Sequence, residues 1–225
     1  MAKHAHFGPA FFGFLAELAR NNERDWFQAN KGRYATEVEG PFLAFLAELE
    51  PRLSKISRHF VVDPRRTGGS MFRIYRDTRF SADKTPYKTH VAAQFSHEAR
   101  SKDRSVPGFY LHLAPDESLG GGGLYHPEPG ALGQVRDRIA GKPKEWEAVL
   151  KGGLPIQGDT LKRPPAGFDP AHRFVDALKR KDHYTMVGFT AKEVQAPGFL
   201  DRYVDSCAEV APLMKFLARA LELPY

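Results

Sequence analysis

One stretch of this 225-residue chain, from Pro64 to His90, concentrates side chains that bind anions. It holds seven basic residues and two acidic ones, namely Arg65, Arg66, Arg73, Arg76, Arg79, Lys84 and Lys88 against Asp77 and Asp83. Guanidinium forks bind phosphate and carboxylate groups through paired hydrogen bonds. Because two acids cannot pair seven bases, the imbalance predicts that an anionic ligand neutralises part of this charge.

Aromatic rings are interleaved with these charges, which a simple solvated basic loop would not require. The four rings are those of Phe72, Tyr75, Phe80 and Tyr87. A lysine close to arginines has its charged form disfavoured, which prepares it to act as a base. The rival interpretation is a structural network, in which Asp77 and Asp83 accept hydrogen bonds from the arginines and hold a turn together.

The first functional hypothesis is therefore a pocket for a small anionic ligand bearing a phosphate or a carboxylate, and whether a reaction follows binding is left open. Arg73, Arg76, Arg79 and Lys88 would hold the anion. Tyr87 would donate a hydrogen bond to it, and Asp77 would orient an arginine or act as a general base. The other candidates complete the pocket if neighbouring strands pair as expected: Tyr75, Lys84, His90, Tyr110, His112 and Tyr125.

Two alternatives belong to other classes of protein. A nucleic-acid-binding module would use the formal net charge of +6 for phosphates and the aromatic rings for bases. However, the chain has no helix-turn-helix, RNP-like or zinc-finger pattern. The third hypothesis is an interaction protein in which the charged stretch is purely structural. In that case Arg79→Ala or Lys88→Ala would change stability and no binding.

No cofactor and no metal site is predicted. The nine histidines form neither HExxH nor a Cys/His cluster. The one close pair is His4-x-His6, near a chain end expected to fray, while His90 and His112 lie on neighbouring predicted strands. Gly120 to Gly123 lacks both the P-loop pattern and the GxGxxG spacing, so a bulged turn or a close backbone approach to a ligand is expected.

The single cysteine, Cys207, lies on an apolar repeat, which predicts an inert buried thiol and a reducing cytoplasm. No secretory signal and no membrane span is expected, because no apolar run reaches the length of a bilayer and Glu17 and Arg20 interrupt the first one. We therefore expect a cytoplasmic protein without a membrane partner. The sequence makes no prediction about its oligomeric state.

Hydrophobic spacing divides the chain into helical ends and a β-rich middle. Helical spacing covers residues 9–53, and short aromatic or β-branched runs at 60–62, 71–75, 90–95 and 108–113 predict strands. The run 119–125 is either a strand or a loop pressed against a ligand. Helices return at 129–141, 146–150 and 174–178, and Thr190 to Glu193 has the form of a capping box. The last helix, 200–221, should kink or split at Pro212.

These elements predict one α+β domain over residues 1–225. An antiparallel sheet in the middle of the chain would be enclosed by N-terminal and C-terminal helices. Hydrophobic residues at 42% and charged residues at 27% are ordinary for a globular protein and exclude disordered and fibrous classes.

The segment FRIYRDTRFSADKTPYKTH (72–90) resembles the signature of a bacterial and fungal family known as domain of unknown function 2461. GFYLHLAPDESLGGGGLYHPEP (108–129) and LKRPPAGFDPAH (161–172) extend the match. The resemblance implies a single cytoplasmic α+β domain and brings no activity, cofactor or catalytic residue. The positions that match the family pattern are Arg73, Tyr75, Arg76, Asp77, Arg79, Phe80, Lys84, Pro86, Tyr87 and Lys88.

Overall fold

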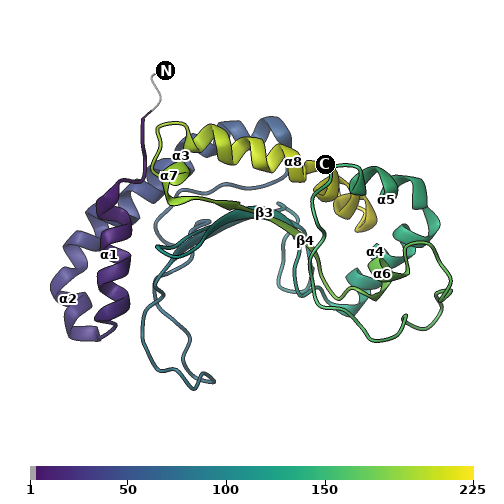
Figure 1. The fold of residues 1–225 in the computed structure, drawn as a ribbon, viewed down its shortest axis with the longest axis horizontal. Coiled ribbons are helices and arrows are strands. Elements are labelled where there is room, and N and C mark those ends of the chain that lie inside the picture. Colours follow the sequence, from purple (N-terminus) through teal and green to yellow (C-terminus); the bar gives the residue numbers. More distant parts are fainter. Residues whose placement is uncertain (1–3) are drawn as a thin grey trace.

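Helices from both ends of the chain flank a four-stranded antiparallel sheet in the middle of the chain, as the sequence predicts, and they leave one of its faces uncovered (Figure 1). A computed structural model describes residues 4–225. The helices are α1 (Pro9–Arg20), α2 (Arg24–Arg33), a π-helical turn η1 (Tyr34–Glu39), α3 (Gly40–Ile56), α4 (Pro129–Gly141), α5 (Pro143–Leu150), α6 (Val175–Lys179), α7 (Ala191–Val194) and α8 (Phe199–Ala220). The strands are β1 (Val91–Ser96), β2 (Gly108–Leu113), β3 (Ser118–Leu124) and β4 (His183–Phe189).

The sheet is an antiparallel meander in which the strands pair in the order of the sequence. Its alternation is visible in β2, where Phe109, Leu111 and Leu113 are fully buried while Tyr110 and His112 are half-buried. One face therefore belongs to the core and the other is partly open to solvent, which is the usual arrangement for an antiparallel sheet. Helix α8 packs on β3 and α3 packs on α8, and no helix formed by residues 4–225 covers the opposite face of the sheet (Figure 1).

The glycine run Gly120 to Gly123 is part of β3, so the strand interpretation of residues 119–125 is the correct one. A Cβ at Gly120 would lie 2.6 Å from Cε2 of Tyr203 on α8, and one at Gly122 would lie 2.9 Å from Sδ of Met214. These two glycines let α8 approach the backbone of the strand. The phosphate-loop interpretation thus has no structural basis here, and close packing explains the composition.

Four elements differ from the sequence prediction. Strand β4 was not predicted, although HYTMVGF is aromatic and β-branched. The runs at 60–62 and 71–75 were predicted as strands but form only isolated bridges, Phe60 with His97, Met71 with Ala93 and Tyr75 with Tyr87. They lie beside the outer edge of β1 and pair with too few residues to form strands. Helix α8 continues across Pro212 without splitting.

The apolar interior has two parts that meet along α8. The larger one joins α1, α3 and the core face of the sheet. The smaller one packs α4, α5 and α6 against the second half of α8, around Trp146, Phe216 and Leu217. Tyr225 packs against both parts at their edges. Helices α1 and α2 lie beside one end of the sheet and α4, α5 and α6 beside the other, so they stand on either side of its helix-free face (Figure 1).

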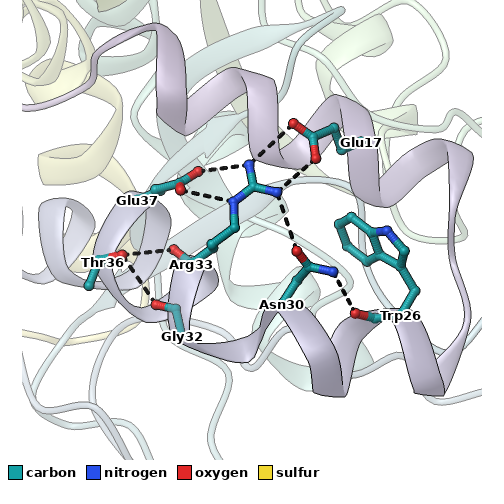
Figure 2. A network of polar contacts seen from close by, with 7 residues as sticks. All are labelled: Glu17, Trp26, Asn30, Gly32, Arg33, Thr36 and Glu37. Atoms are coloured by element: carbon teal, nitrogen blue, oxygen red, sulfur yellow. Dashed lines mark hydrogen bonds and ion pairs between the residues drawn. The ribbon is translucent and has the colours of Figure 1, made fainter.

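Arg33 ties the N-terminal helices together, as Figure 2 shows. Its guanidinium donates to Glu17 of α1 at 2.8 Å, to Glu37 of η1 at 3.0 Å and to Asn30 of α2 at 3.3 Å. Beyond this network, Asn22 at the start of α2 accepts from the Tyr87 amide at 3.0 Å and donates to the Tyr87 carbonyl at 2.9 Å. The N-terminal helices therefore fix the backbone of the charged stretch one residue before Lys88.

Candidate functional site at the helix-free face of the sheet

The charged stretch forms an irregular hairpin attached to the edge of β1. The amide of Phe72 donates to the carbonyl of Ala92 at 2.9 Å. Within the hairpin, the amide of Lys88 donates to the carbonyl of Ile74 at 2.8 Å, and that of Arg76 to Pro86 at 2.9 Å. Figure 1 shows this segment extending away from the sheet, beside its helix-free face. The base of the hairpin thus lies at the sheet, and its tip lies far from it.

Most of the basic side chains in the stretch have protein partners. Arg79 pairs with Asp77 at 2.7 Å, and Arg76 contacts Asp83 and Thr85. These contacts lower the pKa of the Asp77 and Asp83 carboxyl groups to about 2. For Asp77 the main cause is the hydrogen bond from the Arg79 side chain. For Asp83 the largest cause is the hydrogen bond from the Thr85 amide, followed by the one from Arg76. The turn network that rivalled the pocket hypothesis is therefore present at the tip.

Three further cations are satisfied outside that network. Arg65 pairs with Asp63 at 2.6 Å, and Arg66 pairs with Glu39. Lys84 donates to the carbonyl of Thr78 at 2.9 Å. The count of seven bases against two acids overlooked Asp63 and Glu39, which lie outside the stretch in sequence but beside it in space.

The base of the hairpin brings four predicted residues together at the sheet. The rings of His90 and His112 stack with their centroids 4.3 Å apart, and the Tyr110 hydroxyl lies 3.3 Å from Nδ1 of His112. Nζ of Lys88 donates to the carbonyl of Arg73 at 2.9 Å and lies 5.3 Å from the centre of the Phe72 ring. We call Lys88, His90, His112 and Tyr110 the basal cluster.

Burial is the main cause of the electrostatic character of the basal cluster. It lowers the pKa of His90 to about 4, with His112 and then Lys88 as further causes, and it also lowers the pKa of His112. Burial, followed by the charge of Arg73, lowers the pKa of Lys88. Both rings are therefore neutral at pH 7. Within residues 4–225, Lys88 forms no ion pair with a carboxylate, so an anion would stabilise its charged form.

A cleft of about 730 Å³ lies on the helix-free face next to this cluster. Its lining is aromatic and amide-rich and includes Phe72, Gln94, Tyr110, Tyr125, Gln157, Tyr184 and Met186. Phe72, which lies under the Lys88 ammonium, and Tyr110, which contacts His112, belong to both the cleft wall and the surroundings of the cluster. The basal cluster therefore adjoins the cleft through Phe72 and Tyr110, while Lys88, His90 and His112 are not among the lining residues, which do include Glu117.

A smaller recess of about 250 Å³ opens on the other side of the cluster. Lys88 and His90 line it together with Arg76, Thr85 and Thr89. Lys88 and His90 therefore border this recess, and Arg76 and Asp83 of the hairpin tip line it with them.

The remaining predicted residues are not part of the cluster, although the carbonyl of Arg73 accepts a hydrogen bond from Lys88 and Tyr87 lines the smaller recess. Asp77, Arg79 and Lys84 are exposed at the tip, whereas Arg73 and Tyr75 are exposed along the hairpin. Tyr87 was expected to donate to a ligand, but its side chain is 2% exposed and stacks on Phe27 at 4.2 Å. It anchors the hairpin on the N-terminal helices instead.

Sequence reasoning missed most of the cleft wall. Tyr184 and Met186 come from the unpredicted strand β4, and Gln94 was not considered because it interrupts an apolar strand. The sequence signal that could have revealed β4 is the alternation of His183 and Thr185 with Tyr184 and Met186. In the structure the first two side chains are buried and the second two are half-buried. Tyr125, which was predicted, lines the cleft and makes an edge contact with Tyr184 at 5.7 Å.

Fold and site together define a single α+β domain whose antiparallel meander carries an aromatic cleft on its helix-free face. The chain belongs to the family described as conserved hypothetical protein (DUF2461), whose model matches residues 10–216. This confirms the family resemblance of the charged signature. No curated protein and no solved structure matches the chain. Among the helices formed by residues 4–225, none has the length and apolar character needed to cross a bilayer.

Proposed function

We propose that the cleft binds a small ligand whose anionic group, a phosphate or a carboxylate, is held by the basal cluster. The observation that carries the proposal is Lys88: a half-buried ammonium beside two neutral histidines, with no carboxylate partner in the described part of the chain. An anion would supply the missing countercharge, and the imidazoles and the Tyr110 hydroxyl would add hydrogen-bond donors.

The cleft supports a ligand with a flat or apolar body. Its volume of about 730 Å³ lies within the range of small-molecule sites, roughly 300–1,000 Å³. The rings of Phe72, Tyr110, Tyr125 and Tyr184 offer stacking surfaces, and Gln94 and Gln157 offer both donors and acceptors. An aromatic or heterocyclic compound that carries one anionic group fits this combination better than an inorganic anion alone.

Binding of nucleic acid is the second candidate, favoured by the hairpin tip. Phe80 is 95% exposed there, and the guanidinium of Arg79 lies 5.8 Å from the centre of its ring. An exposed ring beside a cation is suited to base stacking and phosphate contact. The ion pairs of Arg76 and Arg79 with their aspartates weaken this candidate, because an incoming phosphate would compete with both carboxylates.

A thermal-shift screen at low and high salt tests the two candidates. The panel contains inorganic phosphate, phenyl phosphate, benzoate, nucleoside monophosphates, and short DNA and RNA oligomers. A ligand at 100 times its dissociation constant stabilises the fold by about 2.7 kcal/mol, or about 5–10 °C for a chain of this size. We expect a salt-tolerant shift with an aromatic monophosphate or carboxylate. A shift confined to oligomers and abolished by salt would favour nucleic acid instead.

Lys88→Gln is expected to weaken binding of the best small ligand by about 10- to 100-fold, the equivalent of one charge-assisted hydrogen bond. Lys84→Gln is the matched control, because it removes the same charge from the exposed tip of the same hairpin. Isothermal titration of both variants measures the difference. Equal affinities in the wild type and Lys88→Gln would exclude the basal cluster as the anion site.

A further inference from the structure

Two histidines before α1 converge on one carboxylate of α3. Nε2 of His4 and Nε2 of His6 each lie 3.4 Å from Oε1 of Glu48. One ligand atom from each of the three residues lies within 4.8 Å of the others. This group is separate from the cleft and from the basal cluster, and no element of the proposed function uses it.

The His6 ring is held firmly and lacks a hydrogen bond at its buried nitrogen. Its side chain is 3% exposed, and Nε2 is buried without a hydrogen-bond partner within the described structure. The ring packs edge-on against Phe45 at 5.3 Å and lies 4.3 Å from the ring of His4. The next residue, Phe7, is fully buried. The packing therefore aims an unsatisfied imidazole nitrogen at the space that His4 and Glu48 share.

Two of the three separations between these ligand atoms match a tetrahedral metal centre, and the third is within 4.8 Å. Ligand atoms on a zinc ion with bonds of about 2.0–2.1 Å lie about 3.3–3.4 Å apart. Both nitrogen-to-oxygen distances here are 3.4 Å. Imidazole and carboxylate donors favour zinc and its neighbours in the first transition row over Mg²⁺ or Ca²⁺.

We propose that His4, His6 and Glu48 form a binding site for a divalent transition-metal ion, with Zn²⁺ as the best match, and that water occupies the fourth position. The bound ion would fasten the segment before α1 to α3. Its role is structural, since the three residues lie outside both hollows of the candidate functional site.

Metal binding is measured on protein without a histidine tag, stripped with EDTA and titrated with Zn²⁺ and with Co²⁺. We expect Zn²⁺ to raise the melting temperature, EDTA to reverse the rise, and Mg²⁺ and Ca²⁺ to have no effect. Co²⁺ should give visible absorption bands typical of low coordination number, which report the ligands directly. His4→Gln and Glu48→Gln each remove one ligand and should weaken binding by at least about tenfold.

Neither substitution threatens the fold, because the side chain of His4 is 59% exposed and that of Glu48 is 43% exposed. Glu50→Gln is the matched control, since it makes the same charge change at an exposed site on the same helix. The proposal is overturned if Zn²⁺ causes no shift and Co²⁺ no bands. It is equally overturned if both effects persist at unchanged affinity in His4→Gln and Glu48→Gln.

Discussion

Replacing Gly120 by alanine is expected to lower the free energy of unfolding by about 1–3 kcal/mol, the usual cost of overpacking a core. The added Cβ would lie 2.6 Å from Cε2 of Tyr203 and 2.9 Å from the Phe189 ring. Tyr203 cannot move aside easily, because it is fully buried and its hydroxyl donates to the carbonyl of Tyr110 at 3.1 Å. The strain would therefore reach β2 at the residue that joins the basal cluster to the cleft.

Gly188→Ala is the control for this substitution. Gly188 also lies in a strand of the same sheet, but a Cβ there would meet no atom within 4 Å. Its replacement should leave stability unchanged or raise it by about 0.4–1 kcal/mol, because alanine restricts the unfolded chain. Urea unfolding of both variants gives the comparison. Equal losses of stability would show that close packing by α8 is not the reason for glycine in β3.

Acidification from pH 6.5 to pH 4 is expected to destabilise the protein, and His183 is one of two histidines, with His90, whose pKa is lowered to about 4. The side chain of His183 is fully buried, and its Nε2 donates to the carbonyl of Ala177 at 3.1 Å. Burial lowers the pKa of His183 from 6.5 to about 4. As the pH falls, the unfolded state takes up this proton first, so stability present above pH 6.5 is lost down to about pH 4. The depressed pKa corresponds to about 3 kcal/mol.

His183→Gln should flatten the dependence of unfolding free energy on pH between 6.5 and 4, whatever its effect on stability at neutral pH. Asp77→Asn is the control, because the pKa of Asp77 is lowered from 3.8 to about 2 and its titration therefore affects stability mainly below this window. Urea unfolding at a series of pH values provides the data. An unchanged slope in His183→Gln would refute the assignment of the acid sensitivity to this residue.

The sequence predicted the fold well where one residue pattern dominates. The alternation of Phe109, Leu111 and Leu113 with Tyr110 and His112 predicted β2 with the bounds that the structure has, Gly108–Leu113. Strand β4 was missed because two of its three buried positions, His183 and Thr185, are polar, and only Phe189 is apolar. Packing against neighbouring strands offsets the low hydrophobicity of these buried side chains. Which strands become neighbours cannot be read from a single sequence.

The candidate site was predicted in part, for a similar reason. His90 and His112 were expected to meet because they lie on neighbouring predicted strands. The structure confirms this contact: His112 lies opposite Ala92, two residues after His90, and the two rings stack. Tyr87 was misplaced because local spacing does not reveal that Phe27 covers its ring. Glu48 escaped attention beside His4 and His6 because only the packing of the chain end on α3 brings it there.

The most direct test of the anion site follows the histidine side chains by ¹H–¹⁵N correlation while phenyl phosphate is added at pH 7. Because an anion favours the protonated imidazole, we expect the His90 and His112 signals to move toward that form. His172, in the loop before α6, is the internal reference and should not move. Binding that leaves the signals of His90 and His112 in place would contradict the account.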